Sequence, residues 1–390
     1  MRGVLIALAG VIVGAIAVLA IPAPGGDEPS RAPVAPLRTV DATTLLAWTP
    51  VQLPDDLPER VEGVDGVSRV TVVRSAIVWL DGWTDEAGQE HRSPDGMRVP
   101  LEVAAIDVDT YLPFVPAADR TTLAELAASN GIVLGDRGAG LRGIRASGSL
   151  LFGEHGVDVT GVIDDGLIGA HEAVISLDRA EQLDVTRARY LLVQVEGGHN
   201  HEDVAARIRN LAKADERLRV RSPGETPEFR HGDAVLPIVG IKERFGEFAA
   251  RPSANGNLEV DRQWMRDHIV DSRVPVLGTV RCHRELIPQL TAAMEEIDRR
   301  GLSDEIDRSD FGGCFSPRYL SQDEDAGLSH HSWGIAFDIN VRTNPFGDEP
   351  TIDPRIVDVL ERWGFAWGGR WLVKDGMHFE YLRPPLSPKG

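Results

Sequence analysis

The chain has 390 residues, only two cysteines and a formal net charge of −19 at pH 7. This length is sufficient for two domains that each bury their own core. The negative charge argues against nucleic acid and against an anionic membrane surface as electrostatic partners, and two thiols cannot form a four-cysteine zinc site.

The chain begins with an apolar segment. Arg2 is followed by an uncharged apolar run over residues 3–23, and about 20 such residues are needed to cross a bilayer as a helix. The run is longer than the apolar region of a cleaved signal peptide, which has about 7–15 residues. We therefore expect residues 1–23 to be a transmembrane anchor, with a removed signal peptide as the alternative. Arg2 favours a cytoplasmic N-terminus, so the bulk of the chain is expected outside the membrane, anchored by a single span or secreted.

The next regions predict a spacer and a β-rich domain. Residues 24–38 are rich in proline and predict an extended linker. Residues 39–221 predict an α+β domain, because short β-branched runs alternate there with Gly, Asp and Pro. A helix is expected from Asn200, which is a suitable N-cap ahead of an apolar stripe. This region shows no catalytic constellation.

A second proline-containing linker, residues 222–237, precedes the last region, residues 238–385. Longer helical patterns begin there. One lies in residues 286–303, and another starts at Asp353 as N-cap, with Pro354 in its first turn. Short strand patterns lie between and after these helices, so the region predicts a second α+β domain.

Residues 334–340 (GIAFDIN) predict a strand with two different faces. Its core face consists of Ile335, Phe337 and Ile339. The other face carries Gly334, Ala336 and Asp338, so two small residues clear the space around a carboxylate. His331 precedes the strand and can turn back over this cleared face.

Residues 375–381 (DGMHFEY) follow a similar pattern, with His378 projecting from a polar face. If the two strands pair, His331, Asp338 and His378 converge. Two imidazoles and one carboxylate are suitable ligands for zinc, with a fourth position left open. Asp375 lies three residues before the second histidine and could act as a general base. Each of these residues taken alone could equally be an ordinary polar residue beside a core strand.

The combination of motifs resembles a known family. SxHxxGxAxD at residues 329–338, WGGRW at 367–371 and DxxHFE at 375–380 are similar to the zinc D,D-carboxypeptidase and endopeptidase family, peptidase family M15, in its VanY-like branch. FGEF, VRCHRELIPQL and GGCFSPRYL also fit, so the resemblance covers about residues 239–384. It implies a C-terminal antiparallel sheet with flanking helices that carries a zinc site.

Residue by residue, the resemblance implies that His331, Asp338 and His378 bind one Zn²⁺ ion and that Asp375 is the base that activates water. Arg318 would stabilise the oxyanion or hold a substrate carboxylate, a task that suits a planar guanidinium.

Two further residues, Ser329 and Glu380, are expected behind the ligands as their partners. Several family members carry glutamate at the position of Asp375, so Glu380 is kept as the alternative base. His330 is expected to point away from the metal, because the motif uses the second histidine of the pair.

The middle region has a second resemblance. SRVTVVRSAIVWL, VAAIDVDTYLPFVP, GIVLGDRGAGLRGI, VDVTGVIDDG and LLVQVEGGHNHEDVAARIRNL resemble, over about residues 60–220, the extracytoplasmic core domain of MacB-type ABC-transporter permeases. In that family the domain mediates interaction and force transmission, which implies a membrane-protein partner for this region.

An extracytoplasmic location affects the interpretation of the cysteines. In an oxidising compartment Cys282 and Cys314 predict a disulfide, which would close a loop of roughly 30 residues and stabilise the fold by about 3 kcal/mol. Two free buried thiols are the alternative.

Taken together, the resemblance implies a membrane-anchored or secreted zinc peptidase, a D,D-carboxypeptidase or muropeptide endopeptidase, with the peptide stems of peptidoglycan as its substrate. Two alternatives stay open. One is a zinc-containing cell-wall binding module without turnover, and the other is an accessory partner of a transporter or division complex that acts through the middle region. The tryptophans near the motifs, Trp333, Trp363, Trp367 and Trp371, serve either packing or substrate contact.

Overall fold

The computed structural model describes residues 42–50, 52–94, 96–213 and 216–385. These described residues form one compact unit. The predicted membrane segment, residues 1–23, and the first spacer, residues 24–38, lie outside the described residues. Among the helices that are described, none has the length and apolar character needed to cross a bilayer.

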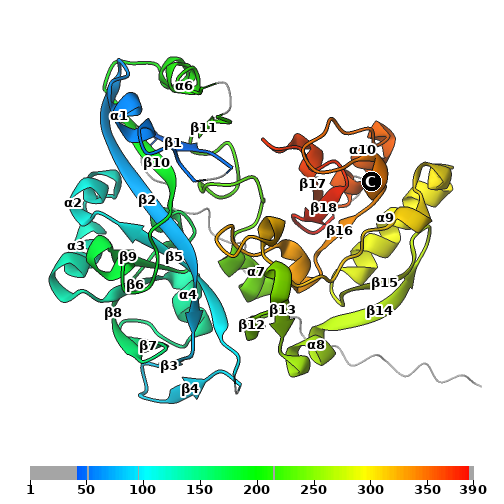
Figure 1. The fold of residues 1–390 in the computed structure, drawn as a ribbon, viewed down its shortest axis with the longest axis horizontal. Coiled ribbons are helices and arrows are strands. Elements are labelled where there is room, and N and C mark those ends of the chain that lie inside the picture. The colour runs from blue at the N-terminus through cyan, green and yellow to red at the C-terminus, as the bar shows by residue number, and fades with distance from the viewer. Residues whose placement is uncertain (1–41, 51, 95, 214–215, 386–390) are drawn as a thin grey trace, which may run out of the picture. The chain divides into compact units, whose positions relative to one another are not determined.

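The first part of the described chain is built on one large mixed sheet (Figure 1). Its strands are β1 (Thr44–Trp48), β2 (Val67–Leu80), β3 (Gly82–Thr84), β4 (Glu90–Arg92), β5 (Val99–Ile106), β6 (Ile132–Gly135), β7 (Gly148–Phe152), β8 (His155–Ile163), β9 (Ala173–Ser176), β10 (Ala188–Val195) and β11 (Arg219–Arg221). They follow the order β11-β1-β10-β2-β5-β9-β6-β8-β7-β3-β4. The pairs β5–β9 and β6–β8 are parallel, and the other neighbours are antiparallel.

Helices cover this sheet on both faces. They are α1 (Leu57–Glu62), α2 (Val108–Tyr111), α3 (Arg120–Ser129), α4 (Asp136–Leu141), α5 (Leu177–Ala180) and α6 (His201–Arg209). Leu45 and Ala47 of β1 belong to the same apolar cluster as buried residues of α1 and α6. Leu46 and Trp48 belong to a second cluster with residues of α2 and α3. Because side chains alternate along a strand, β1 is buried on both faces.

The remaining part combines helices with small antiparallel sheets. Its elements are α7 (Ile238–Phe245), β12 (Ala250–Pro252), β13 (Leu258–Val260), α8 (Arg262–His268), β14 (Ile269–Val274), β15 (Gly278–His283), α9 (Ile287–Arg299), β16 (Ala336–Asp338), α10 (Pro354–Arg362), β17 (Phe365–Trp367) and β18 (His378–Tyr381). β12 pairs with β13, β14 pairs with β15, and the last three strands form the sheet β16-β18-β17. The fold class is therefore α+β, as predicted.

Local sequence signals explain the helix ends. The Asn200 side chain accepts hydrogen bonds from the backbone N–H groups of the first turn of α6, and Asp353 caps α10 in the same way, with Pro354 at its first position. Both caps are as predicted.

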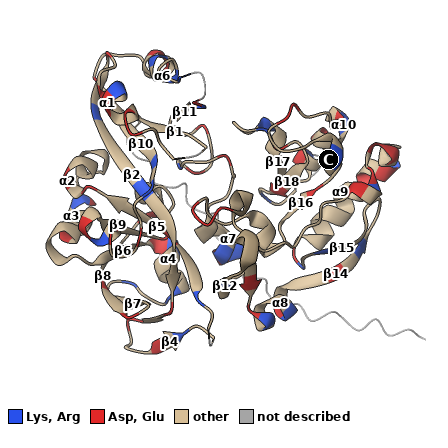
Figure 2. Ribbon diagram, viewed as in Figure 1, with Lys and Arg blue, Asp and Glu red and all other residues tan. Residues whose placement is uncertain are grey.

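Figure 2 shows Lys and Arg interspersed with Asp and Glu along the described chain.

A buried ion cluster joins the large sheet to α7. Lys242 Nζ of α7 lies 2.7 Å from Glu172 Oε1, ahead of β9. Arg142 Nη2, after α4, lies 2.8 Å from Glu247 Oε1, after α7. The side chains of Lys242, Glu172 and Arg142 are fully buried. Charges that water does not reach must be paired, so this cluster fixes α7 against the large sheet.

The predicted linker, residues 222–237, packs against the protein. Phe229 and Arg230 are buried, and Arg230 Nη1 donates hydrogen bonds to the carbonyl groups of Ala234 and Leu236 at 3.1 and 3.0 Å. The segment is therefore a folded connection between the two parts.

Candidate metal centre

The three predicted metal ligands come together at one end of the sheet β16-β18-β17. Asp338 is the last residue of β16 and His378 is the first residue of β18. The antiparallel register places them directly opposite each other, where side chains on the same face are close neighbours. His331 lies in the short 3₁₀ helix His330–Trp333 just before β16.

The potential ligand atoms are close together and buried. Asp338 Oδ1 lies 3.2 Å from His331 Nε2 and 3.1 Å from His378 Nδ1, and the two imidazole nitrogens are 3.2 Å apart. The exposed fraction is 8% or less for all three residues. Two imidazole nitrogens and one carboxylate oxygen in this arrangement are a suitable donor set for zinc.

Hydrogen bonds on the far side of each imidazole support this donor set. His331 Nδ1 lies 2.9 Å from the Cys314 carbonyl oxygen, and a carbonyl only accepts, so Nδ1 donates and Nε2 keeps its lone pair. His378 Nε2 lies 3.3 Å from Glu380 Oε2, so Nε2 donates, and in the neutral ring Nδ1 keeps its lone pair. Both lone pairs then face Asp338, which is the tautomer pattern of metal-binding histidines.

The electrostatics of the cluster favour a positive charge at its centre. Burial opposes ionisation of Asp338, but hydrogen bonds from His331 and His378 hold the pKa of this carboxyl well below its usual range. Burial also opposes a charge on His378, whereas hydrogen bonds with Asp338 and Glu380 raise the pKa of its imidazole to about 10. Without a metal ion, Nδ1 therefore carries a proton at neutral pH, which a bound metal ion would replace. The two carboxylates therefore favour a cation between them.

Asp375 lies in the loop before β18 and differs from the other carboxylates of the site. Burial and the negative charges of Asp338 and Glu380 raise the pKa of Asp375 to about 6, against the opposing charges of His378 and Arg318. Its Oδ1 is buried and has no hydrogen-bond partner among the described residues. A carboxylate that is partly buried, incompletely paired and titrates near neutral pH can accept a proton.

A glycine allows this loop to approach the site. A Cβ atom at Gly368 would lie 2.6 Å from the Asp375 carbonyl oxygen and 3.3 Å from the His378 Cβ. A side chain at position 368 would therefore displace Asp375 and His378 from their present positions. No local sequence pattern predicts this role of Gly368.

Arg318 lies within electrostatic range of the cluster. Its charge lowers the pKa of both His331 and Asp375, although burial is the largest influence on each. Its backbone N–H donates to Ser332 Oγ at 3.0 Å, and its Nη1 donates to the Ser316 carbonyl at 3.2 Å. A half-buried guanidinium at this place can meet an anionic group of a ligand.

The residues expected behind the ligands are found close to them. Ser329 caps the 3₁₀ helix, and its Oγ accepts from the His331 N–H at 3.3 Å. Glu380 is buried beside His378. His330 is not one of the three residues whose ligand atoms converge: it is buried, and its Nδ1 lies 2.8 Å from Glu380 Oε2. A 3₁₀ helix has about three residues per turn, so neighbouring side chains diverge by about 120°, and His330 meets Glu380 while His331 meets Asp338.

The cleared strand face differs from the expectation. The strand covers only Ala336–Asp338, and Gly334 ends the 3₁₀ helix with φ 67°. A Cβ at Gly334 would lie 2.8 Å from the His283 backbone nitrogen, so this glycine serves a left-handed turn packed on β15. The close approach at Asp338 comes instead from Gly312, where a Cβ would lie 2.9 Å from the Asp338 Cβ.

The structure joins Cys282 of β15 and Cys314 by a disulfide. The backbone carbonyl of Cys314 also accepts the hydrogen bond from His331 Nδ1, so the disulfide lies directly behind a proposed ligand.

The tryptophans near the site have different surroundings. Trp333 is fully buried, Trp367 Nε1 donates to the Gly376 carbonyl at 2.8 Å, and the Trp371 ring is centred 5.1 Å from that of His378.

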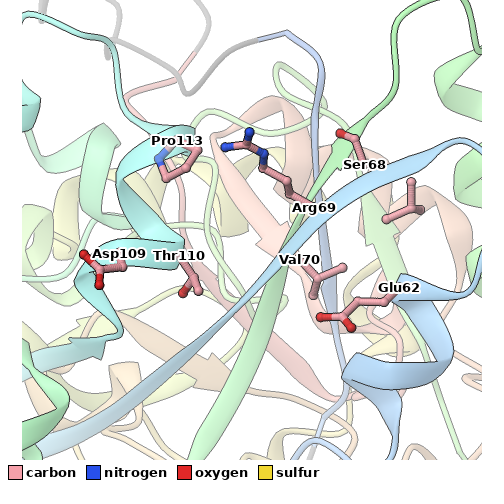
Figure 3. A pocket seen from close by; sticks show the side chains of 8 residues that line it. Glu62, Ser68, Arg69, Val70, Asp109, Thr110 and Pro113 are labelled. Atoms are coloured by element: carbon pink, nitrogen blue, oxygen red, sulfur yellow. The ribbon is translucent and has the colours of Figure 1, made fainter.

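A separate pocket lies on the large sheet among α1, β2 and α2. It has a volume of about 440 Å³, and Figure 3 shows Glu62, Arg69 and Asp109 around it. None of the predicted site residues lines this pocket.

Comparison with solved structures finds extracytoplasmic transporter domains. The periplasmic region of MacB from Actinobacillus actinomycetemcomitans is 10% identical, with coverage of 47% of this chain and 90% of that chain and a TM-score of 0.32. The extracellular domain of the noncanonic ABC-type transporter YknZ from Gram-positive bacteria is 14% identical, with coverage of 46% and 100% and a TM-score of 0.30. At such low scores, no function is transferred from these proteins.

No curated protein matches the chain in sequence. One family model does match, over residues 322–381, and it is described as D-alanyl-D-alanine carboxypeptidase. Both resemblances indicated by the sequence thus recur in the comparisons. The segment that contains His331, Asp338, Asp375 and His378 is similar to a peptidase family.

Proposed function

We propose that this protein is a zinc-dependent peptidase that hydrolyses stem peptides of peptidoglycan outside the cytoplasmic membrane, in the manner of a D-alanyl-D-alanine carboxypeptidase. The observation that carries the proposal is the convergence of His331 Nε2, Asp338 Oδ1 and His378 Nδ1 beside a buried Asp375 oxygen without a partner. The substrate class is taken from the family that matches residues 322–381. The extracytoplasmic location is taken from the predicted N-terminal anchor or signal segment.

His331, Asp338 and His378 would hold the zinc ion. A bound zinc ion supplies Lewis acidity, which polarises the scissile carbonyl and makes water easier to deprotonate at neutral pH. Glu380 and the Cys314 carbonyl hold the far nitrogens of the two imidazoles, so both rings keep the orientation that binding requires.

Asp375 accepts the proton of the attacking water at its free carboxylate oxygen. A pKa raised to about 6 leaves it ionised at neutral pH and still basic enough to take a proton. Arg318 stabilises the negative charge that develops on the carbonyl oxygen, or holds the C-terminal carboxylate of the peptide. The proton on Asp375 then passes to the leaving amine.

Metal removal tests the proposal. The full chain is treated with a chelator, dialysed, and incubated with defined muropeptides with and without added Zn²⁺. We expect release of a terminal D-alanine or another peptide fragment only in the zinc-loaded sample. If no muropeptide is cut by the zinc-loaded chain, the peptidase function is wrong, and zinc binding without turnover would favour a binding module.

A further inference from the structure

We infer that residues 229–236, called the strap below, position the proposed active site, and that Asp233 is a positioning residue for the loop that carries Asp375. This inference rests on the proposed function, because it concerns the base and one ligand of that reaction. It gives the large-sheet part of the molecule, in which the sequence shows no catalytic constellation, an influence on the peptidase chemistry.

The first contact of the strap is made by the Asp233 carboxylate. Asp233 Oδ2 accepts a hydrogen bond from the Leu372 N–H at 2.7 Å. Its Oδ1 accepts from Arg219 Nη1 at 2.6 Å and from Arg221 Nη2 at 3.4 Å. Both arginines belong to β11, the edge strand of the large sheet. One carboxylate therefore connects the large sheet to the loop of residues 368–376, which we call the base loop.

The hydrogen bond from Leu372 to Asp233 holds the middle of the base loop in place. The Gly368 carbonyl closes the loop, because it accepts from the N–H groups of both Trp371 and Asp375 at 3.0 Å. Leu372 lies between these two residues. Its N–H donates to Asp233, and its side chain packs against the apolar cluster that contains Phe229 of the strap. The strap thus holds the loop by one polar and one apolar contact, three residues before the proposed base.

The second contact of the strap reaches a proposed ligand. The Val235 N–H donates to Glu380 Oε1 at 2.9 Å. The other oxygen, Oε2, lies 3.3 Å from His378 Nε2 and 2.8 Å from His330 Nδ1. Glu380 is 1% exposed, so a backbone group of the strap fixes the carboxylate that orients His378.

The strap is itself held in one shape. Arg230 Nη1 donates to the carbonyls of Ala234 and Leu236 on either side of Val235, and Arg221 Nη1 donates to the Arg230 carbonyl at 3.0 Å. Because these hydrogen bonds hold the backbone of the strap, the position of β11 determines where Asp233 and Val235 make their contacts. The large sheet therefore sets where the base loop and Glu380 lie.

The substitution Asp233→Asn in the full chain tests this arrangement. The amide keeps the shape of the side chain but removes the charge that both arginines pair with. We expect faster hydrogen exchange at residues 371–375 and unchanged exchange in β16 and β18. We also expect kcat to fall about tenfold with KM unchanged, since misplacement of a reacting group by about 1 Å can cost up to about 100-fold in rate. Zinc affinity should stay within about twofold of the parent value.

Matched variants serve as controls. Glu259→Gln removes one carboxylate charge from an exposed pair with Arg251, 2.6 Å apart, and should change neither hydrogen exchange nor kcat. Val235→Pro removes the N–H that donates to Glu380, whereas Val235→Ala keeps it, so only the proline variant should weaken zinc binding, about tenfold. Asp233→Ala repeats the first test if the amide still binds the Leu372 N–H.

The outcomes separate this inference from the proposed function. If the zinc-loaded parent cuts no peptide, the proposed function fails, and hydrogen exchange at residues 371–375 still decides the role of Asp233. Unchanged exchange in both Asp233→Asn and Asp233→Ala overturns the inference. A loss of kcat that only follows a lower unfolding midpoint would make Asp233 a structural residue and would overturn it as well.

Discussion

Two buried polar clusters of this molecule differ in charge balance. The cluster between the large sheet and α7 contains two cations, Arg142 and Lys242, and two carboxylates, Glu172 and Glu247. Each carboxylate meets a cationic nitrogen at 2.7 or 2.8 Å. The charges cancel within the cluster, so it is complete without a further ion.

The candidate metal centre has an excess of acceptors. The negative charges of Asp338 and Glu380 raise the pKa of Asp375 there, and in their neutral forms His331 and His378 direct their lone pairs at Asp338. A cation completes such a cluster. Buried carboxylates that outnumber the fixed cations, beside imidazole nitrogens that can bind a metal ion, thus distinguish a candidate metal site from a structural ion network of similar burial.

The largest effect is expected from breaking the ion network. Lys242→Met leaves Glu172 and Glu247 buried with one cation between them, and should lower the free energy of unfolding by about 3–5 kcal/mol. Denaturant unfolding measures this loss. The control Lys213→Met removes an exposed lysine that pairs with Asp56 at 2.7 Å and should lower the free energy of unfolding far less, because water screens this pair. Equal effects of the two substitutions would contradict the structural role of the network.

Removing a ligand should act on the metal centre alone. We expect His378→Ala to weaken zinc binding by roughly 10²–10³-fold, since a total binding free energy of about 10–16 kcal/mol is shared among about four ligands. Competition with a chromogenic chelator measures the affinity. His199→Ala, at a half-exposed histidine of the large-sheet part, is the control. Wild-type affinity in His378→Ala would remove this residue from the site.

A smaller loss of zinc affinity is expected from a change at Glu380, which contacts the ligand His378. Glu380→Gln keeps the size of the side chain but weakens the acceptor that orients His378, so zinc affinity should fall about 10–100-fold. The same chelator competition detects it. An affinity loss as large as that of His378→Ala would instead indicate that Glu380 binds the metal directly.

The smallest expected effect is a change of stability with pH, caused by His283, a buried histidine without a carboxylate partner. Burial, together with the positive charges of Arg284 and Arg244, lowers the pKa of His283 to about 4, against the hydrogen bond to the Phe245 carbonyl, which raises it. The unfolded chain therefore binds a proton that the folded chain excludes, and stability falls as the pH is lowered from about 6.5 towards 4. At pH 5 this loss should be on the order of 1–2 kcal/mol relative to pH 7.

Comparison of the parent with His283→Gln at the two pH values isolates this contribution. The parent should lose more stability between pH 7 and pH 5 than the variant does. An identical loss in both proteins would mean that another group is responsible. The opposite pKa shift of His378, to about 10, shows how far neighbouring carboxylates change the behaviour of an equally buried imidazole.

The parts of the site that could be predicted from sequence depend on local patterns. The alternation of a strand places Asp338 on one face, and the spacing from His331 allows a turn back over it. The caps at Asn200 and Asp353 are also local signals, since their side chains bond to the first turn of their own helices. Metal binding by the three predicted ligands stays a prediction, although the structure brings them together.

The features that escaped prediction are contacts between distant segments. Gly312 and Gly368 permit close approach to Asp338 and Asp375, and nothing in the local sequence distinguishes them from turn glycines. The contacts of Asp233 and Val235 join residues more than 130 positions apart. Short helices such as α2 and α5, with four residues each, are too short for a recognisable apolar period.

The substitution Asp375→Asn offers the most direct test of the central claim. Zinc content and D-alanine release from a defined muropeptide are measured in parallel on the zinc-loaded parent and on the variant. We predict one zinc ion per chain in both proteins, with kcat lowered by about 10²–10⁴-fold in the variant, because only the proton acceptor is lost. Equal release by both proteins at equal zinc content would contradict the role of Asp375, and the absence of bound zinc in the parent would contradict the metal centre itself.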